Sequence, residues 1–292
     1  MKKILQIVLF VLCPLAAFAQ GGSEAMPFVR TEMGPLYTAT AGAAVASPDA
    51  GAWAAFRSAA ALAMSDCVGE GGIEGRYAGG FPGAGAAFSV KPMGNLGIAV
   101  GAFYHAGDVI GDFRTGSILL SAGASYGVTD YLSIGLNTRL AKQNLAEGIA
   151  YNAVSADVSV MGKISDAFYA TAGASALGGK VTSASGSQYP QPGNIYVGVE
   201  YRKEAFDGVF FADAMAEFYF SGAYAAALGG GFTYNETVSF KCGLRYASVW
   251  CVIPTTLSAG ISYHLGDLSL NATYLRQASL NIVTFGIGYK FK

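Results

Sequence analysis

Apolar and polar residues alternate with a period of two along most of this chain, from about residue 73 to its end. The final stretch shows this most clearly. Positions 283, 285, 287, 289 and 291 carry Val, Phe, Ile, Tyr and Phe, whereas the even positions between them carry Thr, Gly, Gly and Lys. Successive side chains of a β-strand point to opposite faces, so the pattern predicts a strand with one oily face and one polar or small face.

The same pattern predicts fourteen strands, an even number, as single-chain bacterial outer-membrane barrels have. The first two predicted strands have the weakest alternation. We expect strands at residues 73–80, 82–90, 95–105, 116–127, 131–142, 149–163, 166–178, 193–203, 208–220, 223–234, 236–247, 256–265, 268–277 and 281–291.

The connections between the predicted strands alternate in length. Those after even-numbered strands are short and rich in Asn, Asp, Gly and Pro, which favour tight turns, whereas the three longest, 106–115, 179–192 and 248–255, follow odd-numbered strands. Short periplasmic turns and longer outer loops are typical of a transmembrane barrel, and a soluble sandwich has no reason to keep this alternation. The predicted fold class is all-β: a transmembrane antiparallel barrel of about fourteen strands, with an N-terminal segment in its lumen.

The N-terminus indicates where the chain is sent. Lys2 and Lys3 precede an apolar run, and Ala17-Phe18-Ala19 fits a cleavage site, so residues 1–19 are predicted to be a secretory signal peptide. Cys13 raises a lipoprotein alternative that its neighbour Leu12 does not favour. After the signal, no apolar run reaches the ~18 residues of a membrane-spanning helix. We expect export to the outer membrane of a Gram-negative cell.

Residues 20–72 form a second region without clean alternation, ahead of a barrel at residues 73–292. The run Ala54–Met64 is rich in alanine and suits a short helix. In a barrel, such a segment lies in the lumen or at the periplasmic mouth. A disordered leader is the alternative.

Composition supports the barrel and narrows the function. Charged residues make up 13% of the chain, against about 25% in soluble domains, and the net charge of −1 gives no reason to expect nucleic acid as a partner. Outer-membrane lipid is an expected partner. After the signal, Cys67, Cys242 and Cys251 remain; Cys242 and Cys251 form a bridge across a loop or are small residues of the barrel wall.

Placing the oily face outward leaves charged residues of mixed sign on the inner face. Mixed signs favour a filled interior over a wide pore, which would carry a ring of one sign; a polar ligand site is the alternative. The inward-facing candidates are Arg139, Asp157, Glu200, Arg202, Asp213, Glu217, Lys241 and Arg245, with Lys163, His264 and Lys290 nearer the strand ends.

Two sets of apolar residues complete the predicted sites. Phe103, Phe211, Met215 and Tyr219 point inward and are candidates for contact with a hydrophobic ligand or, more often in such barrels, with the N-terminal segment. Tyr263, Tyr289 and Phe291 are predicted to lie at the membrane interface, as part of an aromatic girdle.

Nothing in the sequence points to catalysis. The chain has only two histidines, His105 and His264, and no CxxC pair, so no catalytic triad and no zinc site is indicated. Its glycine clusters lie in alternating strands, which excludes a phosphate-binding loop. We expect no enzyme activity, no cofactor and no metal.

The N-terminal region resembles a known family. Ala25-Met26-Pro27-Phe28-Val29, Gly34 and the run from Ala41 to Ala50 are similar to the entry motif of the PorV family, and Trp53 also matches. An Asn-Pro-Ala element of that family is replaced here by Phe56-Arg57-Ser58-Ala59. The resemblance covers about 40 residues.

PorV barrels are related to FadL-type transporters and serve the type IX secretion system of Bacteroidota. The resemblance therefore implies a fourteen-stranded barrel, a shortened paralogue, that acts as an accessory or docking subunit for secreted or membrane proteins of a secretion or assembly complex. The FadL kinship implies an alternative function, the transport of small hydrophobic compounds. A general diffusion porin is a third reading, which the short loops disfavour.

Overall fold

A computed structural model describes residues 24–110, 113–146, 148–178, 180–182 and 186–291 of the chain. The predicted signal peptide and Cys13 lie outside these residues. None of the described helices has the length and apolar character needed to cross a membrane.

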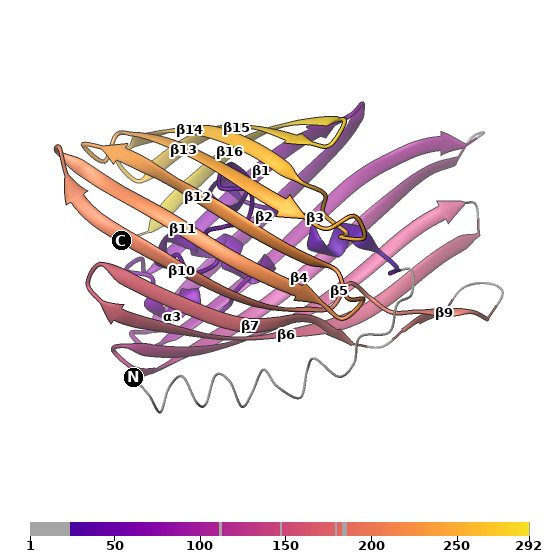
Figure 1. The fold of residues 1–292 in the computed structure, drawn as a ribbon, viewed down its shortest axis with the longest axis horizontal. Helices are drawn as coiled ribbons and strands as arrows, with labels where there is room; N and C mark the ends of the chain where they lie inside the picture. The colour runs from indigo at the N-terminus through magenta and orange to yellow at the C-terminus, as the bar shows by residue number, and fades with distance from the viewer. Residues whose placement is uncertain (1–23, 111–112, 147, 179, 183–185, 292) are drawn as a thin grey trace.

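Fourteen antiparallel strands form a closed barrel, and each strand pairs with its neighbours in chain order (Figure 1). The small hairpin β8 (Val181–Thr182) and β9 (Gln188–Tyr189) lies in the connection between β7 and β10. The barrel strands are β1 (Gly69–Ala78), β2 (Phe81–Met93), β3 (Leu96–Ile110), β4 (Phe113–Thr129), β5 (Leu132–Ala146), β6 (Ile149–Ser165), β7 (Phe168–Gly178), β10 (Asn194–Ala205), β11 (Gly208–Tyr219), β12 (Tyr224–Tyr234), β13 (Val238–Ala247), β14 (Thr256–Leu265), β15 (Leu268–Gln277) and β16 (Leu280–Phe291).

The barrel closes where the sequence pattern is weakest. The first strand, β1, pairs with the last, β16, over ten residue pairs from Gly69↔Phe291 to Ala78↔Ile282, and Ile73 lies opposite Ile287. The predicted fold class is therefore confirmed, including the strand count and the pairing of the two edges.

Several predicted boundaries differ from the structure by a few residues, and two of the differences have a clear physical reason. The first strand begins at Gly69, not at Ile73, because glycines at positions 69, 71 and 72 carry no side chains that could show alternation. The predicted loop 106–115 is mostly strand: β3 continues to Ile110 and β4 begins at Phe113, across a bulge between Ala106 and Val109. The loop is predicted because glycine and aspartate are frequent in this stretch. In the structure the strands continue through it, and β3–β6 extend well past their neighbours at one end of the barrel (Figure 1).

The outer face of the barrel is apolar, with aromatic residues at both ends. Leucine, isoleucine and valine side chains are exposed along the middle of the strands. Such an arrangement matches the apolar band and flanking girdles of a transmembrane barrel. Exposed aromatics near the end with the short turns include Phe88, Tyr126, Phe240, Tyr263, Tyr289 and Phe291, and those near the opposite end include Tyr77, Tyr104, Tyr224, Tyr246 and Tyr274.

The N-terminal segment lies inside the barrel and crosses its lumen (Figure 1). It contains η2 (Pro27–Arg30), α2 (Pro35–Ala39), η3 (Pro48–Phe56) and α3 (Ala61–Met64). Most of its residues are buried, although Pro27 and Asp49 are exposed, and residues 43–46 have no exposed surface. We call residues 24–64 the plug.

The alanine-rich run 54–64 does not form the single helix that its composition predicts. The 3₁₀ helix η3 ends at Phe56, Arg57 has a non-helical backbone, and α3 begins only at Ala61. The break turns the Arg57 side chain toward a carboxylate of the barrel wall, so tertiary contacts override the helix propensity of alanine.

Glycines of the wall make room for the plug. A side chain at Gly243 would overlap the backbone of Thr40 and Ala41, and one at Gly135 would overlap that of Ala59 and Ala60. On β3, the place of a side chain at Gly101 is taken by the ring of Phe56. The many inward-facing glycines thus let the plug backbone lie directly against the wall.

Candidate functional site

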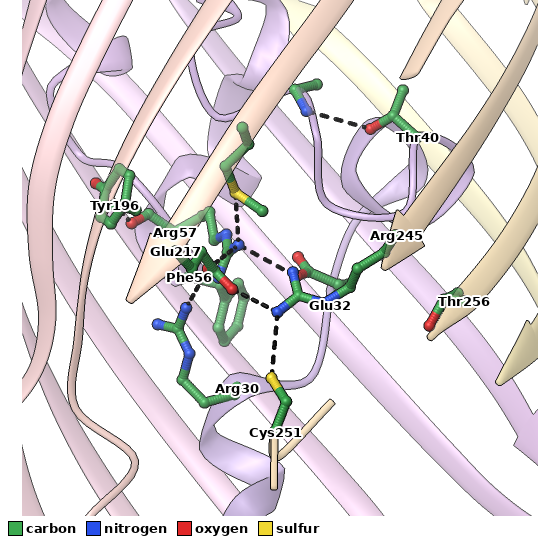
Figure 2. A network of polar contacts seen from close by, with 12 residues as sticks. Arg30, Glu32, Thr40, Phe56, Arg57, Tyr196, Glu217, Arg245, Cys251 and Thr256 are labelled. Carbon is green, nitrogen blue, oxygen red and sulfur yellow. Dashed lines mark hydrogen bonds and ion pairs between the residues drawn. The ribbon is translucent and has the colours of Figure 1, made fainter. Parts of the chain in front are cut away.

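The centre of the lumen holds an ionic cluster built on Glu217 of β11 (Figure 2). Arg30 and Arg57 of the plug place their Nη2 atoms 2.8 Å and 2.6 Å from its Oε1, and Arg245 of β13 binds its Oε2. Tyr219 donates its hydroxyl to Oε2 at 3.0 Å. One carboxylate of the wall thus ties two arginines of the plug to two strands.

Glu32 of the plug adds a second carboxylate, 3.3 Å from Arg57 Nη2. Burial alone would lower the pKa of Arg57, but the carboxylates of Glu217 and Glu32 raise it, so the guanidinium stays charged. Buried ion pairs of this kind depend on every partner being present, because removal of one leaves an uncompensated charge.

A second tie lies on β5 and β6. Arg139 pairs with Asp157, and both side chains are fully buried. The same guanidinium donates to two plug carbonyls, Val29 O at 2.9 Å and Phe56 O at 2.5 Å. Serines of the wall act in the same way: Ser133 donates to Ala60 O at 2.7 Å. These contacts satisfy backbone carbonyls of the plug that would otherwise be buried without a partner.

A third tie is made by Arg202 of β10. Its guanidinium contacts Glu200 on the same strand and lies 2.8 Å from the carboxylate of Asp49 in the plug. It also donates to Ser47 Oγ at 3.2 Å. Asp213 of β11 lies directly opposite Glu200 and is buried. The plug is therefore held by three separate groups of polar contacts with the wall.

The other predicted site residues lie on the face of the wall that their strand parity predicts. Lys241 lies on the inner face and donates to Ser262 Oγ at 2.7 Å. Met215 contacts Arg57 and packs on plug residues, and Phe103 lies in the apolar cluster that contains Trp53 and Phe56. Phe211 and Tyr219 are buried in the lumen, whereas Tyr263, Tyr289 and Phe291 are exposed on the outer face.

Sequence reasoning missed the plug's half of these ion pairs. Arg30, Glu32, Asp49 and Arg57 were not among the predicted site residues, although all four contact wall residues or each other. The signal was present: residues 24–64 contain only five charged residues in a segment otherwise rich in alanine, glycine and other small residues. Charges in so apolar a segment require partners.

The resemblance residues of the plug also have physical roles. Gly34 has a positive φ of 90°, and a side chain there would overlap the Trp53 ring. Gly42, with φ of 82°, leaves room for the carboxylate of Glu32. Ser47 accepts a hydrogen bond from the backbone N–H of Asp49 at 3.3 Å and so caps η3.

All three cysteines of the described chain are free thiols. Cys242 is exposed on the outer face of β13, whereas the sulfur of Cys251 lies 3.9 Å from Arg245 Nη2. The bridge between Cys242 and Cys251, one of the two alternatives that the sequence leaves open, is not formed.

The two larger recesses lie on opposite sides of the barrel wall, one in the lumen beside the plug and one on the outer face. The first, about 390 Å³, opens at the end with the short turns. It is lined by plug residues, including Asp49 and Trp53, and by polar residues of the wall, including Arg202, Lys241 and Lys290.

The second recess is an apolar groove of about 920 Å³ across β1–β4, β15 and β16. Small residues form its floor, including Gly75, Ala84, Ala86 and Ala102, and larger ones stand around it, including Ile73, Tyr104, Ile118, Phe285 and Ile287. Behind this part of the wall lies the plug, since a side chain at Gly85 would meet Met33 and Trp53.

No family model matches this sequence, and no curated protein matches it. Several solved structures are similar to this chain. The CymD monoaromatic hydrocarbon channel superposes with a TM-score of 0.66 at 14% identity, over 88% of this chain and 97% of that one. The Pseudomonas putida toluene transporter TodX gives 0.63 at 14%, over 89% and 98%. A Pseudomonas aeruginosa FadL homologue gives 0.63 at 10%, also over 89% and 98%.

At these identities the similarity shows the fold. This chain, a closed fourteen-stranded barrel, shares its fold with these three proteins, and the superpositions cover nearly the whole of each of them.

Proposed function

We propose that this protein is an outer-membrane channel for small hydrophobic compounds, closed to water and ions by its plug. The observation that carries the proposal is the apolar groove in the wall directly outside the plug. The fold supports the same reading, because the similar structures are named as channels or transporters of monoaromatic hydrocarbons and toluene.

The apolar outer face supports placement in a membrane. Charged side chains facing lipid at mid-depth cost about 2–4 kcal/mol each, and the charged residues of the central cluster instead face the lumen. The predicted signal peptide supports export, and together these features favour the outer membrane.

The filled lumen disfavours an aqueous pore. Plug residues such as Ala44, Ala52 and Ala55 have no exposed surface, and the central ionic cluster is itself fully buried. Hydrophilic solutes have no wide path past these residues. A hydrophobic compound has a second option, because it can partition into an apolar groove that faces the bilayer.

Filling the groove is expected to slow the passage of hydrophobic compounds. Ala86 faces outward on β2 in the groove floor, so Ala86→Phe places a large ring in it. We expect the initial rate of toluene uptake by cells that carry the variant to fall several-fold. The matched control is Ala259→Phe, an exposed outward position on β14 away from the groove. Equal uptake by both variants would contradict a role for the groove.

A docking role in a secretion or assembly complex is a second candidate. Exposed apolar residues at the two ends of the barrel support it. Phe206, in the turn after β10, is 90% exposed, and Val249 and Trp250, after β13, are 90% and 83% exposed. Exposed apolar residues at loop tips suit contact with a protein partner, and the PorV resemblance of the plug points the same way. Purification from detergent-solubilised membranes tests this role. Recovery of a barrel without any stoichiometric membrane or secreted protein speaks against it.

A further inference from the structure

A third, smaller recess lies at the mouth opposite the short turns, between the plug and the β13–β14 connection. Its volume is about 170 Å³. Apolar side chains form most of its walls, and one guanidinium opens into it. The lining residues are Pro27, Phe28 and Thr31 of the plug, Arg76 of β1, Val252, Ile253 and Pro254 of the connection, and Gln277 of β15.

Arg76 is the charged group of this recess. It is only 7% exposed, and among the described residues it forms no ion pair within 4.0 Å. Among the described residues, its hydrogen bond runs from Nη1 to the backbone carbonyl of Glu32, at 3.2 Å. A guanidinium offers five N–H donors in a planar fork, so most of its donor capacity remains for a ligand.

Two acidic residues lie near Arg76, but neither forms a direct ion pair with it within 4.0 Å among the described residues. The Glu32 carboxylate pairs with Arg57 at 3.3 Å. Glu74 precedes Arg76 by two positions on β1 and is buried; its carboxylate lies near enough to interact electrostatically with Arg76, but it forms no ion pair within 4.0 Å. His105 of β3 also lies near Arg76. Because no carboxylate binds the Arg76 guanidinium directly, its N–H donors can form charge-assisted hydrogen bonds to an incoming anion.

The size of the recess limits that anion to a small one. A cavity of about 150 Å³ lined by apolar side chains accommodates benzene, and the volume here is about 170 Å³. Phe28, Ile253 and Pro254 provide the apolar surfaces for a single ring.

We propose that this recess binds a single-ring aromatic carboxylate, with the ring against Phe28 and Ile253 and the carboxylate on Arg76. This inference rests on the proposed function, since it extends the compounds handled from neutral hydrocarbons to their carboxylic acids. It is measured by binding, which is independent of uptake.

The test is isothermal titration of the full-length barrel in detergent with benzoate, benzamide and acetate. Benzoate has both the ring and the charge, benzamide lacks the charge, and acetate lacks the ring. We expect benzoate to bind and the other two to bind about tenfold more weakly or not at all, because each lacks one of the two contacts.

Two variants locate the site. Arg76→Gln removes the charge and Ile253→Trp fills the recess; each is expected to weaken benzoate binding about tenfold or more. Arg276→Gln is the matched control, since Arg276 lies near the same mouth but is exposed and bound to Asn281. If Arg76→Gln fails to fold, Ile253→Trp and the comparison of benzoate with benzamide still test whether the recess binds the ring and the charge.

Benzamide binding as tight as benzoate binding, unchanged binding in Ile253→Trp, or no benzoate binding at all would overturn the proposal. Toluene uptake by cells that carry the wild-type chain separates this result from the proposed function. Toluene uptake without benzoate binding would support the proposed channel function and contradict this binding site. Benzoate binding without toluene uptake would support the binding site and contradict the channel function.

Discussion

Replacing Glu217 with glutamine is expected to destabilise the plugged barrel by about 3–5 kcal/mol, the cost of removing one partner from a buried ion pair. The carboxylate accepts from Arg30, Arg57 and Arg245, and all four side chains are at most 4% exposed. An amide of the same size has one oxygen and one N–H₂ group. The N–H₂ group would face guanidinium donors, and three positive charges would share a single remaining carboxylate, Glu32.

Thermal unfolding in detergent, followed by the heat-dependent shift of the band on gel electrophoresis, measures this loss. The matched control is Glu204→Gln, which makes the same change at an exposed position near the end of β10. The control is expected to unfold at the wild-type temperature. An equally stable Glu217→Gln barrel would show that the cluster does not hold the plug in place.

Replacing Gly243 with valine is expected to open the lumen. The new side chain would occupy the space of the plug backbone at Thr40 and Ala41, with its Cβ 2.7 Å from Ala41 N. Backbone cannot yield by a change of rotamer, so the plug segment must move away from β13. The strand itself retains its outward pattern, and valine favours strands, so the barrel is expected to remain closed around a displaced plug.

Ionic conductance across planar bilayers measures the opening. The wild-type chain is expected to conduct little, and Gly243→Val is expected to raise the conductance and expose the plug to trypsin. Gly162→Val on β6 is the control, because its nearest neighbour, Tyr131 O, is 3.7 Å from the new Cβ. Low conductance in both variants, with the plug protected from trypsin, would count against a tightly seated plug.

The sequence predicted the strands of the barrel wall better than the structure and contacts of the plug. Alternation identified all fourteen strands, because a wall with lipid on one side and a polar lumen on the other imposes a period of two. It failed where that contrast is absent. The glycines at the start of β1 show no side-chain pattern, and the far ends of β3 and β4 carry glycine and aspartate.

The inward-facing wall charges could be identified from the same pattern, but their partners could not. Arg139 and Asp157 follow from the parity of their strands. That Arg139 would also bind two plug carbonyls, or that Arg57 would meet Glu217 across 160 positions, depends on the path of a segment with no periodicity. Composition indicates that such a segment is packed, and only the fold shows against what.

The recesses were not predictable from the pattern at all. Each joins residues from several strands, and two of the three also include plug residues. Small residues such as Ala84 and Ala86 carry no signal of their own. Their importance lies in what surrounds them, which depends on strand register and on the closure of β1 against β16.

The most direct test of the central claim is to compare the uptake of labelled toluene with that of a labelled hydrophilic sugar of similar size. Both are measured in cells that carry the full chain and in cells that lack it. A plugged channel for hydrophobic compounds predicts a faster initial rate for toluene and no change for the sugar. A faster rate for both compounds, or for neither, would contradict it.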